Sequence, residues 1–123
     1  MDVKKCLDTY ALMEITEGNQ RFSSYIGSNF VITDITLAEF YGVLLRKKGE
    51  QIAEYWFRKF EEYSVSVSKE ILIEAVKFRY KYKKTGISFF DAVGYIFSVE
   101  NGFHFVTGDK EFEKLKDVDF KKK

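Results

Sequence analysis

Apolar residues along the chain follow two periodicities, which predict strands and helices in turn. Short runs rich in β-branched and aromatic side chains are typical of strands, and longer stretches with apolar residues three and four positions apart are typical of helices. The expected strands are 3–8, 29–33, 64–67, 103–107 and 118–120. The expected helices are 9–15, 19–26, 34–48, 50–63, 69–84, 88–101 and 109–115.

Strands that alternate with helices along one chain favour an α/β fold. Each strand–helix–strand unit places two parallel strands in one sheet, with the helix packed across them. We therefore expect a central, mainly parallel sheet of about four to five strands with helices on both faces. The 123 residues are 46% hydrophobic, which is enough to bury one core. The sequence predicts a single domain over residues 1–123.

The net charge of the chain is close to zero, because 20 basic and 19 acidic residues give +1. This balance provides no overall attraction to a polyanion, so any contact with nucleic acid has to be local. The lone cysteine, Cys6, cannot form an internal disulfide, and the N-terminus has no signal-peptide pattern. The apolar runs are too short for a membrane span. These features predict a protein of the reducing cytoplasm without a membrane segment.

Four acidic residues lie in apolar stretches, where an unpaired carboxylate is costly. They are Asp8, Glu39, Asp91 and Asp109. The first and the last follow expected strands, and the other two are expected in the first turns of helices. In parallel α/β units, the C-terminal ends of strands and the N-terminal ends of helices lie at one edge of the sheet. All four carboxylates are therefore expected at the edge where open α/β sheets bind ligands.

Converging carboxylates repel one another unless a cation compensates their charge. Ligands that are all oxygen select a hard ion such as Mg²⁺ or Mn²⁺. A structural explanation stands beside this one. The two helical acids fit capping boxes with the expected N-caps Thr36 and Ser88, and the two acids that follow strands fit N-caps themselves. Caps need not share one edge of the sheet, whereas the ligands of a metal site must.

Other features also have two explanations. Residues 77–84 interleave basic and aromatic side chains, which suits contact with RNA phosphates. Cations also favour a helix C-terminus, which is the simpler explanation. Gly42 and Gly94 each lie three residues after an acid, where they leave room for close packing or for substrate, and we favour packing. His104 and Cys6 are expected to be structural.

The order of the acidic motifs resembles the PIN domain family. The chain has LDT at 7–9, an acid early in a helix at Glu39, S-x-x-D at 88–91 and VTGD-x-x-F at 106–112. In length and simplicity the chain is most similar to the VapC toxins of toxin–antitoxin pairs. The resemblance spans the whole chain, with the motifs in the expected order.

This resemblance implies a three-layer PIN-like fold and a metal-dependent endoribonuclease, in which metal-activated water hydrolyses RNA phosphodiester bonds. One or two Mg²⁺ or Mn²⁺ ions would be held by Asp8, Glu39, Asp91 and Asp109. Thr9 and Thr107 would orient carboxylates or substrate, and Glu111 stands where the family often carries another Asp. The resemblance also implies a homodimer that a small VapB-like antitoxin inhibits.

Two other functions remain open on the sequence. A PIN-fold module that binds metal or a partner without cleaving RNA would keep the same acids, because fold alone does not fix function. A receiver-type phosphoacceptor domain also has an acidic pocket and about this length. It is disfavoured because it needs an acidic pair after the first strand, where this chain has Asp8 alone. In addition, the segment 64–69 (SVSVSK) supplies no phosphoacceptor Asp.

Overall fold

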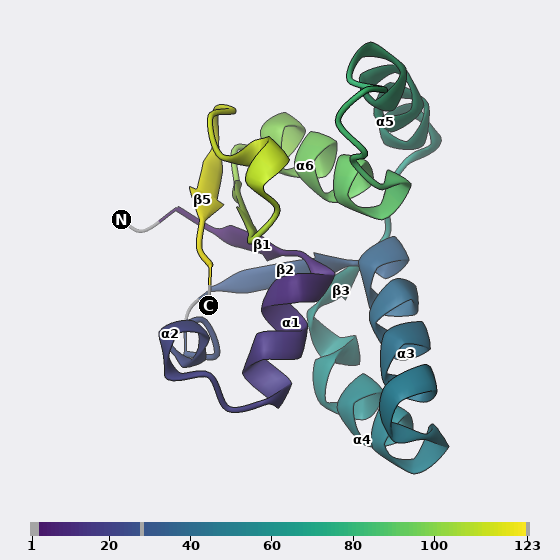
Figure 1. The fold of residues 1–123 in the computed structure, drawn as a ribbon, viewed down its shortest axis with the longest axis vertical. Coiled ribbons are helices and arrows are strands. Elements are labelled where there is room, and N and C mark those ends of the chain that lie inside the picture. The colour runs from purple at the N-terminus through teal and green to yellow at the C-terminus, as the bar shows by residue number, and fades with distance from the viewer. Residues whose placement is uncertain (1–2, 28, 123) are drawn as a thin grey trace.

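The fold of the computed structural model is an open parallel sheet covered on both faces by helices (Figure 1). The structure describes residues 3–27 and 29–122. The strands are β1 Lys5–Leu7, β2 Phe30–Thr33, β3 Ser64–Val65, β4 His104–Thr107 and β5 Val118–Phe120. The helices are α1 Thr9–Thr16, α2 Gln20–Ser23, α3 Asp34–Lys48, α4 Glu50–Phe60, α5 Lys69–Lys81 and α6 Phe89–Asn101, with 3₁₀ turns η1 Glu61–Tyr63 and η2 Lys110–Phe112.

All neighbouring strands pair in parallel, in the order β3-β2-β1-β4-β5. The first strand is therefore central, and the chain moves to one side of it for β2 and β3 and to the other side for β4 and β5. The α/β architecture with its mainly parallel sheet is confirmed. The strand order reverses between β1 and β4, which is the position where open α/β sheets form their ligand crevices.

Alternation along each strand divides the core between the two faces of the sheet. Leu7 and Val106 belong to one buried cluster with residues of α1, α3 and α4. Their neighbours Cys6 and Phe105 belong to a second cluster with residues of α5 and α6. Successive side chains of a strand point to opposite faces, so each central strand contributes to both clusters. The result is the three-layer arrangement that the PIN resemblance implied, with α1 to α4 on one side and α5 and α6 on the other (Figure 1).

Several elements are shorter than the periodicity predicted. The helix expected at 50–63 ends at Phe60 and continues as a 3₁₀ turn, and the helix expected at 69–84 ends at Lys81. The segment 19–26 forms only the short α2, which the buried Phe22 anchors to the core, and Ile26 beyond it is 53% exposed. Strand pairing likewise stops at Val65, because β3 lies at the edge of the sheet and has one neighbour.

Two residues expected to be structural lie where the sequence placed them. Cys6 is fully buried in β1, and burial raises the pKa of its thiol to about 12, so the thiol stays protonated. His104 begins β4 and is half-buried. Within the described ranges, no helix has the length and apolar character needed to cross a bilayer.

The two mid-helix glycines differ in what surrounds them. A Cβ atom on Gly94 of α6 would stand 2.6 Å from Cε1 of Phe105, well inside van der Waals contact. Gly94 therefore lets α6 approach β4 closely, as the packing explanation predicted. A Cβ atom on Gly42 of α3 would meet only Nη1 of Arg46, at an ordinary 3.6 Å. Packing does not require glycine at that position.

We predict that Gly94→Ala lowers the free energy of unfolding by about 1–3 kcal/mol, the usual cost of an over-packed core. Gly42→Ala is the matched control and should leave stability unchanged or raise it by up to about 1 kcal/mol, because alanine favours a helix over glycine. Urea denaturation followed by circular dichroism measures both. Equal stability of the two variants would contradict the close approach of α6 to β4.

Candidate functional site

Asp8 lies directly after β1, at the C-terminal edge of the sheet. Its side chain is 2% exposed and caps α1, where Oδ1 accepts a hydrogen bond of 2.8 Å from the backbone N–H of Ala11. Its own backbone N–H donates to the carbonyl of Val106 on β4. The cap expected from the sequence is therefore present. A carboxylate offers about four acceptor sites, so capping leaves Asp8 able to bind further groups.

Thr107, the last residue of β4, connects Asp8 to Asp109. The buried Thr107 hydroxyl hydrogen-bonds to the Asp8 side chain, and its oxygen accepts a hydrogen bond of 3.0 Å from the backbone N–H of Asp109. Asp109 in turn caps η2, because its Oδ1 accepts from the N–H of Glu111 at 3.0 Å. One hydroxyl thus fixes two of the predicted site acids relative to each other.

Glu39 lies on α3, one turn further into the helix than the sequence suggested. The helix begins at Asp34, and its N-cap is Thr33, whose hydroxyl accepts from the N–H of Thr36 at 3.0 Å. The expectation that Thr36 is the N-cap was wrong, because Thr36 lies within the helix and donates its backbone N–H to the hydroxyl of Thr33, the last residue of β2. Glu39 therefore does not complete a capping box. Its carboxylate instead accepts a short hydrogen bond from the Thr9 hydroxyl of α1.

Asp91 lies in the first turn of α6, as predicted. Ser88 is the N-cap, and its hydroxyl accepts from the backbone N–H of Asp91 at 3.1 Å and also bonds to the Asp91 side chain. Figure 1 shows the N-terminal ends of α3 and α6 side by side, and the two helices are in contact. The S-x-x-D motif therefore works as a helix cap and also presents an acid beside the helix that carries Glu39.

The four acids interact electrostatically, as a shared site requires. The pKa of Asp91 is raised to about 8, mainly by burial and to a lesser extent by the charges of Asp8, Glu39 and Asp109. Burial also raises the pKa of Asp8 to about 7, with smaller contributions from Glu39 and Asp109, although the bonds from Thr107 and Ala11 oppose this rise. The charges of Glu39 and Asp109 act on both Asp8 and Asp91, which indicates that the four carboxylates lie near one another at the C-terminal edge of the sheet.

The nearness of the four acids does not by itself form a metal site. Across the described ranges, no three side chains of the His, Cys, Asp or Glu type stand in an arrangement that could hold a metal ion. The chemistry of the acids fits a hard cation, because all the ligand atoms are carboxylate oxygens. Without an ion, burial together with the neighbouring charges raises the pKa of Asp8 and Asp91. Mg²⁺ keeps several of its waters when it binds, so these acids suit an ion held partly through water.

Two contacts at this edge gave little signal in the sequence. Gly108 lies between Thr107 and Asp109, and a Cβ atom there would overlap the ring of Tyr10 on α1. The end of β4 therefore lies close against α1. The only sign of this contact in the sequence was the glycine of the TGD motif. Glu111 is exposed, and the contact that the structure shows for it is its backbone bond to Asp109.

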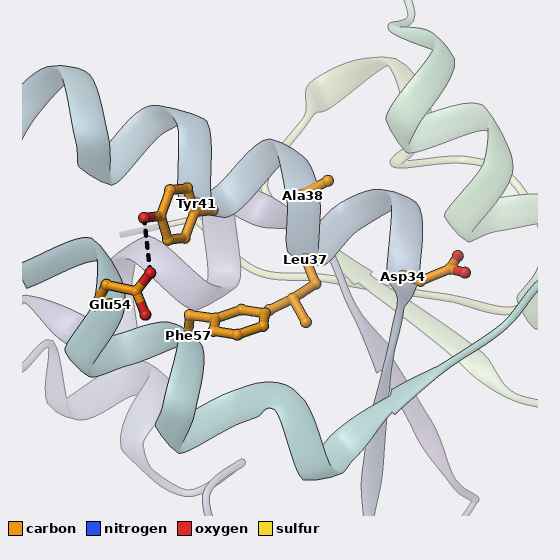
Figure 2. Close-up of a pocket in the computed structure, with 6 residues that line it drawn as sticks. All are labelled: Asp34, Leu37, Ala38, Tyr41, Glu54 and Phe57. Carbon is orange, nitrogen blue, oxygen red and sulfur yellow. Dashed lines mark hydrogen bonds between the residues drawn. The ribbon is translucent and has the colours of Figure 1, made fainter. Parts of the chain in front are cut away.

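A pocket of about 480 Å³ lies between α3 and α4 and reaches Asp34 in the first turn of α3. Figure 2 shows Tyr41 and Glu54 joined by a hydrogen bond of 3.1 Å across it, with Asp34 at its far end. None of the four predicted site acids is among its lining residues, which are Asp34, Leu37, Ala38, Tyr41, Glu54 and Phe57. The pocket is a feature of the helix pair and not of the carboxylate cluster.

Solved structures similar to this one include a toxin and toxin–antitoxin complexes. A toxin–antitoxin complex from Klebsiella pneumoniae has a TM-score of 0.73 at 19% identity, over 94% of this chain and 95% of the other. VapC20 of Mycobacterium tuberculosis, described as a toxin that cleaves the sarcin–ricin loop, has a TM-score of 0.72 at 17% identity, over 91% and 95%. DNA-bound VapBC from Salmonella typhimurium has a TM-score of 0.72 at 18% identity, over 98% of each chain.

The identities to these VapC toxins are low, so the likeness shows a shared fold. No curated protein matches the chain. The family model described as the PIN domain matches residues 5–118, which include all four acids and the whole sheet apart from the end of β5. The chain belongs to the PIN domain family.

Proposed function

We propose that this protein is a metal-dependent endoribonuclease and the toxin of a VapBC-type pair. The observation that supports this most is the set of four carboxylates at the sheet edge of a PIN domain, where burial and the neighbouring charges raise the pKa of Asp8 and Asp91. Folding holds these charges together against their repulsion, and a bound cation would remove that repulsion. The likeness to VapC20, described as an RNA-cleaving toxin, points in the same direction.

The ligands of one or two Mg²⁺ or Mn²⁺ ions would be Asp8, Glu39, Asp91 and Asp109. When bound, such an ion supplies a water of lowered pKa and neutralises charge on the phosphate. The chain itself positions the ligands. Each acid is anchored by a hydrogen bond before any ion arrives, so the ordering cost of binding is low.

Three hydroxyls orient these carboxylates in the proposed site. Thr9 holds Glu39, Thr107 holds Asp8, and Ser88 holds Asp91. Loss of a group that orients a metal ligand in this way lowers metal affinity or activity by about 10–100-fold. Glu111, at the rim, is assigned only a contact with substrate or with a second ion.

The proposed partners follow from the relatives. Structures of the same fold were solved as VapBC or toxin–antitoxin complexes. We propose by analogy a VapB-like antitoxin, a homodimer and a cytoplasmic location for this chain.

One observation favours a second candidate, a PIN module that binds a partner without cleaving RNA. The acids of the described residues do not form a ready-made metal site. The receiver-type alternative has no such support, because the chain matches the PIN family and the strand order β3-β2-β1-β4-β5 differs from the receiver order. Cleavage and metal binding separate the two remaining candidates.

The first test is cleavage of a mixed structured RNA pool in Mn²⁺ or Mg²⁺, with and without chelator. We expect wild-type protein to cleave only with metal. The cleavage rate of Asp8→Asn and of Asp91→Asn should fall at least about 100-fold. Removal of a group that only orients a metal ligand costs up to about that much, and removal of the ligand itself should cost more. Asp34→Asn changes an exposed acid in the first turn of α3 and is the matched control that should cleave normally. Equal cleavage by all samples would indicate a contaminating nuclease.

The second test is thermal stability in Mn²⁺. An ion that binds only the folded state stabilises it by about 2.7 kcal/mol when its concentration is a hundred times Kd. The melting temperature rises as a result. We expect the shift in wild type and its loss in Asp91→Asn. A shift that survives in each of the four single amide variants, Asp8→Asn, Glu39→Gln, Asp91→Asn and Asp109→Asn, would contradict a shared site.

The third test is the pH dependence of stability without metal. The folded-state pKa of Asp91, about 8, lies above the ordinary value of 3.8 for this carboxyl, so the folded state binds a proton that the unfolded state releases. The stability that this proton contributes is complete below the unfolded-state pKa of 3.8. It is lost as pH rises through the folded-state pKa of about 8. In chelator, wild type should therefore lose more stability than Asp91→Asn between pH 5 and pH 8.5.

At pH 8.5 we expect Asp91→Asn to melt about 4–8 °C above wild type, which corresponds to about 1–2 kcal/mol in a domain of this size. Differential scanning calorimetry in chelator measures this, with Asp34→Asn as the control that should follow wild type. A difference that does not grow with pH would show that Asp91 carries no repulsive penalty.

A further inference from the structure

A basic surface lies at the C-terminal end of α5 and in the turn that follows it. We call it the α5 basic surface and define it by Arg79, Tyr80, Lys81, Lys83 and Lys84, all of which are exposed. In the described part of the chain none of its four cations pairs with a carboxylate, and the ion pair within α5 joins Lys77 to Glu74 instead. Four unpaired cations are a strong local charge in a chain whose net charge is +1.

Helix capping explains only part of this charge. Cations are favoured near a helix C-terminus, an effect that falls off within the last turn. Arg79 and Lys81 lie in the last turn of α5, which ends at Lys81. Lys83 and Lys84 lie beyond the helix, so its dipole does not account for them.

The α5 basic surface also contains a hollow and an exposed aromatic ring. The hollow has a volume of about 310 Å³ and is lined by Val76, Arg79, Tyr80, Lys83, Gly86 and Ile87. The Tyr80 residue is 67% exposed, and Nζ of Lys83 lies 4.7 Å from its ring centroid. An accessible ring flanked by cations is the arrangement on which proteins stack unpaired bases of single-stranded nucleic acid.

This hollow lies close along the chain to the acidic edge. Nε of Arg79 donates a 3.0 Å hydrogen bond to the carbonyl of Ile87, which fixes the loop against α5. The next residue, Ser88, caps α6 and binds Asp91. Asp91 lies four positions after Ile87, so their Cα atoms are at most about 14 Å apart. A strand a few nucleotides long spans that distance.

We propose that the α5 basic surface binds a single-stranded stretch of RNA, with one unpaired base stacked on Tyr80 and phosphates beside Lys83 and Lys84. This inference rests on the proposed function, since it places the substrate next to the four carboxylates. An acidic protein segment would use the cations but would not need the exposed ring beside them. The combination of ring, hollow and cations therefore favours RNA.

The test is fluorescence anisotropy of the full-length protein with a short, labelled, unstructured RNA oligonucleotide, in chelator so that no cleavage occurs. We expect Tyr80→Ala to raise Kd at least fivefold, the lower range for loss of one stacked base. Tyr80→Phe keeps the ring and should bind as wild type does. Lys83→Ala/Lys84→Ala should raise Kd and lower the slope of log K against log salt by about 1.4, because each single-strand phosphate contact contributes about 0.7.

The matched control is Lys47→Ala/Lys48→Ala, which removes two exposed cations from the C-terminal turn of α3. It should leave Kd and the salt slope close to those of wild type. Unchanged RNA affinity in the α5 variants, which is the result that an acidic protein partner would give, overturns the proposal. An equal loss in the control also overturns it, because binding would then follow overall charge.

Failure of this inference is distinguishable from failure of the nuclease proposal. Protein that binds RNA through the α5 basic surface but cleaves nothing in Mn²⁺ supports the surface and contradicts the nuclease. If the protein cleaves RNA only with metal, and substitution of Tyr80 or of Lys83 and Lys84 leaves its Kd for RNA unchanged, then only the proposal about the α5 basic surface is contradicted.

Discussion

Parallel pairing of the central strands is the constraint on which the acidic edge depends. Because β1 and β4 are neighbours and run in the same direction, the residues that follow them, Asp8 and Asp109, leave the sheet side by side. The helices that carry Glu39 and Asp91 must begin at that same edge to pack back over the sheet. An antiparallel neighbour would send one acid to the opposite edge. The fold therefore concentrates negative charge before any ligand is present.

Helix capping and the proposed metal binding are compatible uses of the same side chains. Asp8 caps α1 and Asp109 caps η2, yet both still raise the pKa of Asp91. A cap fixes a carboxylate in one orientation, and that is also what an ion needs from its ligand. Sequence motifs that suit a cap do not by themselves count against a functional site. The cost of the cluster lies in burial and repulsion, which the hydroxyls of Thr107 and Ser88 reduce but do not remove.

The sequence predicted what depends on periodicity and missed what depends on contacts between distant residues. Alternating strands and helices established the parallel sheet and which residues end each strand. The start of α3 was misplaced because Thr33 and Thr36 are both good caps, and only the end of β2 decides between them. The bond from Thr9 to Glu39 joins residues 30 positions apart. The fit of Gly108 against Tyr10 likewise depends on how β4 meets α1, which no local pattern contains.

In the proposed nuclease, the acidic edge also sets a requirement on how RNA approaches it. Phosphates and carboxylates repel each other, so an edge that collects four acids does not attract its own substrate without help. A cation at the carboxylates reverses this locally, but such interactions fade over about 8–10 Å at physiological salt. Salt screens the attraction of basic side chains over the same range, so they help only where phosphates pass close to them. Such side chains must therefore be close to the acids along the chain yet not neutralise them. Lys83 and Lys84 meet both conditions, because they precede the α6 cap and pair with no carboxylate among the described residues. Keeping the opposite charges apart lets the acids repel one another until an ion binds and leaves the lysines free for phosphate.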